Sequence, residues 1–249
     1  GAGEDVYLGS KIARARVRGY QGDDLRATDT LLATAKHFAG YGAAQAGRDY
    51  HTVDISERTL RDVYLPPFQA TVDEGVATFM TSFNEYDGVP ASGSRYLLTD
   101  VLRDQWGFDG FVVTDYTSIN EMVPHGYARD LKQAGEQALN AGVDMDMQGA
   151  VFMENLAKSV EQGLVDVADI DTAVRRILEM KYRLGLFEDP YRYADNARQE
   201  ATLYKPEFLE AARDVARKSM VLLKNEGNVL PLAASAKRIA VIGPLGNSK

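Results

Sequence analysis

Several features that define other classes of protein are missing from this sequence. It contains no cysteine, which excludes a disulfide scaffold, a cysteine-ligated zinc site and a thiol nucleophile. Basic residues number 28 against 36 acidic ones, a net charge of −8, which is the opposite of the balance expected for a nucleic-acid-binding protein. No apolar run approaches the ~20 residues of a membrane span, so we expect no membrane partner.

Histidine is scarce, and the chain does not begin with methionine. The three histidines, His37, His51 and His125, do not favour a metal site, and we predict none. The sequence opens with Gly1 and shows no signal peptide. We therefore expect a processed, trimmed or partial chain.

The 249 residues, 45% of them hydrophobic, are sufficient for a sizeable core. Apolar runs alternate with helical periodicity along the chain. We expect strands at 31–38, 76–83, 110–115, 142–147 and 238–243. We expect helices at 5–18, 56–73, 94–105, 128–141, 150–162, 169–184 and 206–224. Alternating strands and helices indicate βαβ units and a parallel sheet.

The length fits a (β/α)₈ barrel, but such a barrel needs eight strands. Only five strand candidates are visible. Either some strands escape detection, or the chain is part of a barrel with a further segment appended.

Polar residues follow three of the expected strands, where chemistry is located in parallel α/β folds. Asp115 comes after the apolar run 111–113 and is flanked by hydroxyl-bearing residues. A partly desolvated carboxylate at that position suits a nucleophile or a general base. Position alone favours a commoner role, in which Asp115 caps the next helix or turn.

Two further polar pairs stand near strand ends. Lys36 and His37 suit hydrogen bonding to a polyol or a carboxylate, but position alone favours a structural histidine beside a solvated lysine. Asp144 and Asp146 alternate with apolar residues. They are candidates for metal or sugar ligands, and a structural hydrogen-bond network is the interpretation that we favour.

Several segments together resemble glycoside hydrolase family 3, the β-glucosidase family. The strongest match is residues 101–118, which read VLRDQWGFDGFVVTDYTS and resemble the family's active-site signature. Residues 36–42, KHFAGYG, resemble its Lys-His loop. Shorter similar segments are GRDY at 47–50, DISER at 54–58, YLPPF at 64–68, DGVPA at 87–91, AGVDM at 141–145 and LGLF at 184–187. The resemblance covers nearly the whole chain and keeps its order.

The resemblance implies a (β/α)₈ TIM-type barrel followed by an α/β sandwich domain. On that template, residues 1–186 are the C-terminal part of the barrel, whose first strands are missing here. Residues 187–236 are a linker and connecting helix, and 237–249 are the truncated first strand of the sandwich domain. The missing pieces account for the low number of strands.

The resemblance also implies retaining hydrolysis of terminal non-reducing β-D-glucosyl residues through a covalent glycosyl-aspartate. Asp115 aligns with the family's nucleophile. Lys36 and His37 align with residues that bind sugar hydroxyls, and Met80 aligns with a residue that lines the sugar pocket. The substrate would be a β-glucoside or oligosaccharide, and the chemistry needs no cofactor.

Other positions depart from the family's pattern. Tyr116 stands where many members carry tryptophan, and Phe83 where many carry tyrosine. Arg48 is a weaker candidate for orienting the glycine loop or contacting sugar. The family's acid/base is usually a glutamate of the second domain, so the resemblance places it outside this chain. We therefore expect full turnover only in a longer protein.

Three alternatives remain at this stage. The sugar could be a β-xyloside, or an N-acetyl-β-hexosaminide if Asp49 and His51 form the Asp-His pair of the aminosugar branch; we interpret His51 as a loop residue. The chain could instead be noncatalytic and bind only sugar or a partner chain. The sequence does not predict an oligomeric state, and a periplasmic or secreted location rests on family analogy alone.

Overall fold

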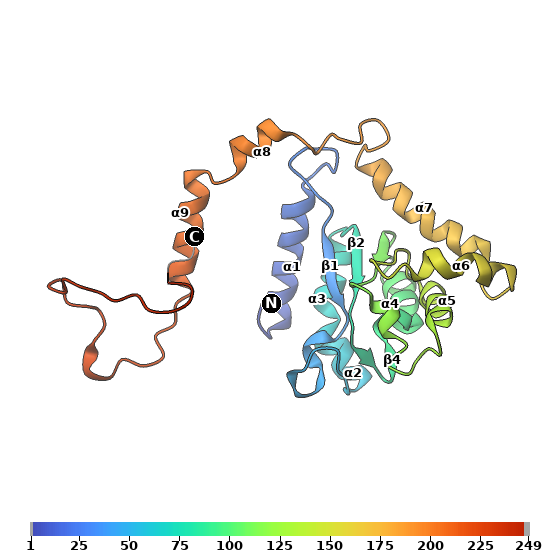
Figure 1. Ribbon diagram of the computed structural model, residues 1–249, viewed down its shortest axis with the longest axis horizontal. Coiled ribbons are helices and arrows are strands. Elements are labelled where there is room, and N and C mark those ends of the chain that lie inside the picture. The colour runs from blue at the N-terminus through green and yellow to red at the C-terminus, as the bar shows by residue number, and fades with distance from the viewer. Residues whose placement is uncertain (1, 247–249) are drawn as a thin grey trace. The chain divides into compact units, whose positions relative to one another are not determined.

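The strands lie in the sheet in the order of the sequence. In this computed structural model, which describes residues 2–246, three parallel strands pair in the order β1-β2-β5 (Figure 1). They are β1 (Thr34–Phe38), β2 (Thr78–Thr81) and β5 (Phe111–Val113). Val113 also forms a parallel bridge with Met145, at the position of the fourth expected strand. Helical segments join the neighbouring strands, which confirms the parallel α/β arrangement.

The two faces of the sheet differ in composition. Ala35, Phe79 and Val112 point to one face and belong to the main buried cluster, which the helices complete. Met80 lies on the other face and is only partly buried. Alternate residues of a strand point to opposite faces, so this register alone decides which side chains enter the core.

Helices α1 (Val6–Gln21) and α3 (Pro66–Asp73) pack against each other, and α3 also contacts β1 (Figure 1). The Asp5 carboxylate caps α1 by accepting the Leu8 N–H at 2.6 Å. Gln21, buried at the end of α1, bridges the starts of β1 and β2. Its Oε1 accepts from the backbone N–H groups of Ala33 (3.2 Å) and Ala77 (2.9 Å), and its Nε2 donates to Gly75 O (2.9 Å).

The helix expected at 56–73 is divided into three parts. Ser56 caps α2 (Glu57–Thr59), a π-helical segment η3 (Leu60–Tyr64) follows, and α3 begins at Pro66. The break before α3 coincides with Pro66, because a proline ring cannot continue the preceding hydrogen-bond ladder. The helix expected at 94–105 is the π-helical η5 (Tyr96–Gln105).

Three of the remaining helices of the first unit lie where the sequence predicts helices: α5 (Leu131–Ala141), α6 (Val151–Glu161) and α7 (Val167–Arg183). The short α4 (Ser118–Glu121) was not predicted. Aspartates cap two of them: Asp130 accepts from Gln133 N at 2.9 Å, and Asp166 accepts from Ala168 N at 2.9 Å. Gly142 ends α5 with a left-handed φ of 112°.

A short hairpin follows β2. Its strands are β3 (Glu85–Tyr86) and β4 (Val89–Pro90). Asp87 and Gly88 between them both have positive φ, 53° and 76°, as a tight two-residue hairpin turn requires. Val53 N donates to Glu85 O at 2.9 Å, so the hairpin also holds the end of the loop that follows β1.

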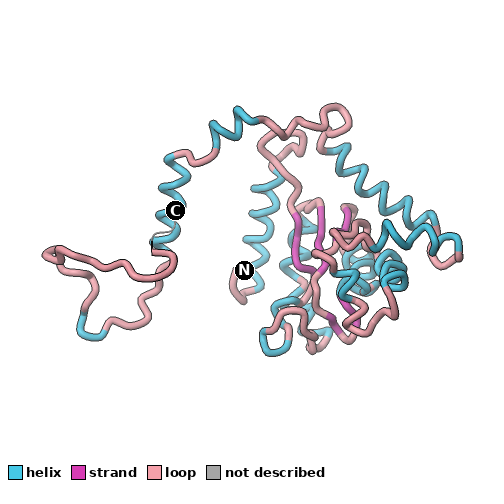
Figure 2. The backbone as a smooth tube through the Cα atoms, in the orientation of Figure 1, coloured by secondary structure: helices cyan, strands magenta, loops and turns pink. Residues whose placement is uncertain are grey.

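The second unit begins at Asp195, later than the expected boundary at 186/187. It contains α8 (Asn196–Thr202), α9 (Pro206–Lys218) and the 3₁₀ turn η6 (Glu226–Asn228), and Figure 2 shows no strand in its described part, residues 195–246. The prediction of a strand at 238–243 is therefore wrong for this structure. Those residues are irregular and exposed, because a strand forms only where a neighbour satisfies its backbone groups. The last expected sandwich residues, 247–249, lie outside the described residues.

Candidate active site

The carboxyl ends of β1, β2 and β5 bring polar residues together at one edge of the sheet. His37 lies near the end of β1, and Asp115 follows β5 by two residues. His37 Nε2 lies 3.4 Å from Asp115 Oδ2. The two side chains are 29% and 16% exposed, so both are sheltered and still reachable by a ligand.

The Asp115 carboxylate is oriented by its own turn. Its Oδ1 accepts the backbone N–H of Tyr116 at 2.7 Å. Ser118 N donates to the Asp115 carbonyl at 3.1 Å, and Thr117 N donates to Met147 O at 3.0 Å. The cap position of α4 is Thr117, in a left-handed conformation, and no side chain caps the helix. Asp115 therefore does not cap α4, although its Oδ1 bonds within the turn; its Oδ2 is directed to His37.

The surroundings of His37 favour the neutral form of its imidazole. Burial and the neighbouring Lys36 ammonium lower the pKa of His37 below its usual 6.5, while Asp115 and Asp49 oppose the shift more weakly. A neutral imidazole presents one N–H donor and one acceptor nitrogen. It can therefore bond the carboxylate and a ligand hydroxyl without carrying charge.

Two polar side chains at the end of β2 support the Lys-His loop. Asn84 Nδ2 donates to the Ala39 carbonyl at 3.2 Å, and Ser82 Oγ approaches the same oxygen at 3.4 Å. Both residues are buried. The peptide bonds Lys36-His37 and Phe38-Ala39 that they adjoin are cis. Nothing in the sequence pattern indicated that Ser82 and Asn84 face the neighbouring loop.

Aromatic rings extend from the His37–Asp115 pair along the loop after β1. Tyr41 lies edge-on to His37, with ring centroids 5.5 Å apart. Phe83 lies 6.4 Å from Tyr41 and 4.5 Å from Tyr50. These rings give the site an apolar wall on one side, opposite in character to its charged centre.

The other predicted site residues are more dispersed. Met80 pairs with Val113 in the ladder, on the partly open face of the sheet. Arg48 is exposed and follows the short turn η2 (Gln45–Gly47). Tyr116 is next to Asp115 and 56% exposed, so its ring stands in solvent. Among the side chains of the predicted site residues, within residues 2–246, the direct approach that we observe is that of His37 to Asp115.

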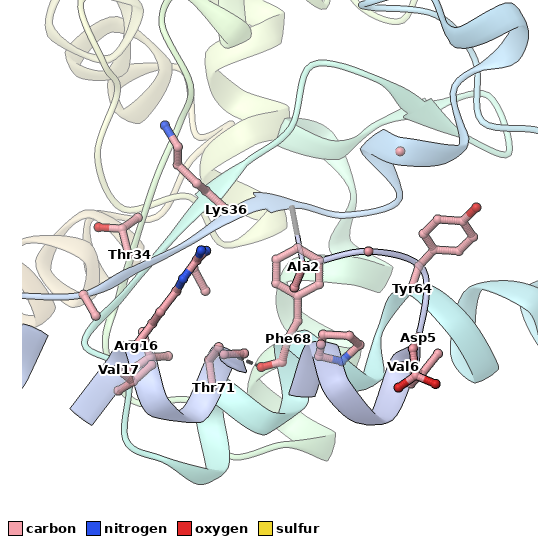
Figure 3. A pocket seen from close by; sticks show the side chains of 18 of the residues that line it. Ala2, Asp5, Val6, Arg16, Val17, Thr34, Lys36, Tyr64, Phe68 and Thr71 are labelled. Carbon is pink, nitrogen blue, oxygen red and sulfur yellow. Dashed lines mark hydrogen bonds between the residues drawn. The ribbon is translucent and has the colours of Figure 1, made fainter. Parts of the chain in front are cut away.

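Lys36 lies beside a large cavity at the β1 edge of the sheet. The cavity, of about 820 Å³, is bounded by α1, β1 and α3. Phe68 and Thr71 of α3 line the cavity, and Figure 3 shows the Lys36 ammonium directed away from them. The Lys36 side chain is exposed, and its positive charge contributes to lowering the pKa of His37.

Asp144 and Asp146 belong to structural networks, as we favoured from the sequence. The buried Asp144 carboxylate accepts from Arg103 (2.6 Å), Arg176 (2.8 Å) and the Val112 N–H (2.7 Å). Asp146 Oδ2 accepts the Val151 N–H at 2.7 Å, at the start of α6. Within residues 2–246, no cluster of histidine and acidic side chains has the arrangement of a metal site.

A carboxylate and an imidazole at the carboxyl edge of a parallel sheet occupy the position where (β/α)₈ and doubly wound α/β folds carry their sites. The model of the glycosyl hydrolase family 3 N-terminal domain matches residues 1–180. The chain belongs to this family, and its fold is the family's TIM-barrel-like α/β fold.

Relatives of this chain include two bacterial glycosidases. A periplasmic β-glucosidase of Salmonella typhimurium is 41% identical over 100% of this chain and 33% of its own length. A β-xylosidase of Formosa agariphila is 40% identical over 97% of this chain and 35% of its own length. The chain thus spans about a third of the length of these relatives.

Solved structures show the same fold. A β-glucosidase from Listeria innocua in complex with isofagomine superposes with a TM-score of 0.86 at 40% identity, covering 93% of this chain and 33% of that one. Its D270A mutant in complex with laminaribiose gives a TM-score of 0.87 at 40% identity, covering 93% of this chain and 32% of that one.

Among the described residues, no helix is both long and apolar enough to cross a membrane.

Proposed function

We propose that this chain carries the nucleophile of a retaining β-glucosidase and that Asp115 is that nucleophile. The observation that carries the proposal is the geometry around its carboxylate: one oxygen accepts the Tyr116 N–H, and the other lies 3.4 Å from the His37 imidazole, whose pKa is lowered by burial and by Lys36. The partly buried carboxylate keeps one oxygen free of strong charge pairing. It is therefore available to attack carbon.

The reaction that we propose has two steps. Asp115 attacks the anomeric carbon of a terminal β-D-glucosyl residue while the bond to the leaving oxygen breaks, and that oxygen takes the electron pair and a proton from an acid. Water then attacks the glycosyl-aspartate, gives its proton to the same group acting as base, and frees Asp115. We propose that this second carboxyl lies outside the 249 residues, since the chain spans about a third of its relatives.

The remaining site residues receive binding roles. We assign Lys36 and His37 to sugar hydroxyls, Met80 to the wall of the sugar pocket, and Tyr116 to the side of the leaving group. We assign the exposed Arg48 to orienting the glycine loop or contacting sugar. The relative named a periplasmic β-glucosidase supports a periplasmic or secreted location.

A β-xyloside is the second candidate substrate. The relative at 40% identity that is named a β-xylosidase supports it. The two sugars differ only in the hydroxymethyl group at C5, so one nucleophile serves both. The choice depends on the space around that group.

The test is the intact mass of the chain after incubation with 2,4-dinitrophenyl 2-deoxy-2-fluoro-β-D-glucoside. Dinitrophenolate leaves without an acid, so the reaction needs only the nucleophile and the sugar pocket. We expect one added fluoroglucosyl group, mapped to the peptide that contains Asp115 and absent in Asp115→Ala. The corresponding xyloside, run in parallel, measures the preference between the two sugars.

Asp146→Asn is the matched control, because it removes a carboxylate near a strand end outside the His37 pair and should keep the adduct. An adduct that persists in Asp115→Ala contradicts the assignment. A chain that melts cooperatively and forms no adduct, alone or within a protein of the relatives' length, contradicts the proposed function.

A further inference from the structure

Three buried hydroxyl groups form a triangle beneath the turn that carries Asp115. Thr81 Oγ1 lies 2.7 Å from Ser92 Oγ, and Ser92 Oγ lies 2.7 Å from Ser118 Oγ. The third side, Thr81 Oγ1 to Ser118 Oγ, measures 3.4 Å. All three residues are at most 3% exposed. We call this group the hydroxyl triangle.

Each corner belongs to a different element. Thr81 is the last residue of β2, Ser92 lies in the 3₁₀ turn η4 (Ala91–Gly93), and Ser118 is the first residue of α4. The triangle therefore joins the end of one strand, the segment after the hairpin and the start of the helix that follows Asp115. No backbone hydrogen bond that we observe makes this three-way connection.

Ser118 is the corner nearest to Asp115 along the chain. Its backbone N–H donates to the Asp115 carbonyl at 3.1 Å, while its side chain enters the triangle. Thr117 between them has a left-handed φ of 57°, which is unfavourable for a residue with a branched Cβ. The turn therefore needs support from its surroundings to keep its shape.

Hydroxyl groups provide a kind of support that apolar side chains do not. A buried hydroxyl costs free energy unless it is hydrogen-bonded, and each one can donate once and accept. Mutual bonding meets this need only in one relative placement of the three oxygens, and neighbouring bonds reinforce one another. Apolar contacts are not directional, so replacement by methyl groups would fill the space and leave the angle of the turn less defined.

We propose that Thr81, Ser92 and Ser118 are positioning residues, which hold the turn at 115–118 so that the Asp115 carboxylate stays in line with the anomeric carbon. The functional part of this inference rests on the proposed function. Reaction rates are sensitive to misplacement of about 1 Å, so a small rotation of the turn is sufficient to slow attack.

The experiment compares Thr81→Val with Thr81→Ser. Valine keeps the shape of threonine and removes the hydroxyl, whereas serine keeps the hydroxyl and removes the methyl group. Two experiments are made on the chain. The kinetics of labelling by the dinitrophenyl fluoroglucoside give a limiting rate and a half-saturation concentration. Hydrogen exchange of the amides at 116–121 gives the exchange rate of the turn.

We expect Thr81→Val to lower the limiting labelling rate on the order of tenfold, with little change in half-saturation, and to speed exchange at 116–121. Thr81→Ser should restore the limiting labelling rate and the exchange rate at 116–121 to near those of the unmodified chain. Ser118→Ala should act in the same direction as Thr81→Val.

Ser159→Ala is the matched control. The Ser159 hydroxyl is also buried, donates to Glu136 at 2.7 Å and lies in α6. Its loss should lower the melting temperature and leave both labelling and exchange at 116–121 unchanged. This control separates a general loss of stability from a local change at the turn.

Unchanged labelling and exchange in Thr81→Val would overturn the proposal, as would a Thr81→Ser variant as defective as Thr81→Val, since the methyl group would then be the important part. If the unmodified chain forms no adduct at all, the failure belongs to the proposed function. Hydrogen exchange then decides by itself whether the hydroxyl triangle holds the turn.

Discussion

His37 and Asp115 approach to 3.4 Å although their strands are not neighbours in the sheet. His37 belongs to β1 and Asp115 follows β5, with β2 between those strands. The pairing of β1 with β2 is irregular between Ala35 and Phe38, so the end of β1 departs from regular register where His37 lies. The irregularity allows one imidazole to reach across the carboxyl end of the central strand.

The first prediction concerns the pH dependence of stability. Because the pKa of His37 is lowered in the folded chain, the unfolded chain binds a proton first as the pH falls below about 6.5. The free energy of unfolding therefore falls as the pH is lowered from about 6.5 to the folded pKa of His37. The slope is less than about 1.4 kcal/mol per pH unit. Above about pH 6.5, His37 is neutral in both states and no longer changes the stability. His37→Asn should flatten the dependence. Urea unfolding at several pH values measures it.

His51→Asn is the control for that measurement, because the His51 side chain is exposed and lies outside the His37–Asp115 pair. Its curve should run parallel to that of the unmodified chain. A His37→Asn curve with the original slope would show that His37 does not contribute.

The second prediction concerns Asp144. Its carboxylate is 1% exposed and is shared by Arg103, whose side chain is 9% exposed, and by Arg176. Asp144→Ala leaves the Arg103 guanidinium buried without its partner, so we expect a loss of about 3–5 kcal/mol in the free energy of unfolding. Denaturant unfolding checks this. Asp23→Ala removes an exposed aspartate and should change stability by no more than about 0.5 kcal/mol.

A third prediction uses two glycines with opposite surroundings. A Cβ at Gly110 would lie 2.0 Å from the Ala77 carbonyl oxygen and 2.7 Å from the Phe108 ring, just before β5. Gly110→Ala should therefore cost more than about 4 kcal/mol or prevent folding. A Cβ at Gly19, within α1, meets nothing within 4 Å.

Gly19→Ala should consequently stabilise the chain by about 0.5–1 kcal/mol, because alanine favours the helix. Thermal unfolding of both variants tests the pair. Equal effects of the two substitutions would contradict the close approach of β2 and β5 at Gly110.

The fourth prediction concerns Gln21, whose amide satisfies two N–H groups and one carbonyl at the starts of β1 and β2. Gln21→Leu keeps the size of the side chain and leaves those buried groups without partners. We expect a loss of about 2–4 kcal/mol. Gln162→Leu, at an exposed glutamine after α6, should be nearly neutral, and chemical denaturation compares the two.

Local pattern was sufficient to predict most elements of the first unit. The apolar runs at 31–38, 76–83 and 110–115 contain β1, β2 and β5, and the last part of the helix at 56–73 begins at Pro66. Side-chain period and the geometry of proline act over a few residues, so they can be recognised without knowing the fold. Asp115 and His37 were recognised through position at strand ends and through resemblance to the family.

The partners of those residues depended on tertiary structure. Register irregularity in β1 brings His37 to Asp115, and packing of three distant elements forms the hydroxyl triangle. The apolar run at 238–243 forms no strand, although its pattern is as good as that of β5, because no neighbour pairs with it. Sequence determined which segments were able to form strands and which polar residues ended them; contact across the sheet decided which strands formed and which side chains met, since such pairing depends on residues far apart in the chain.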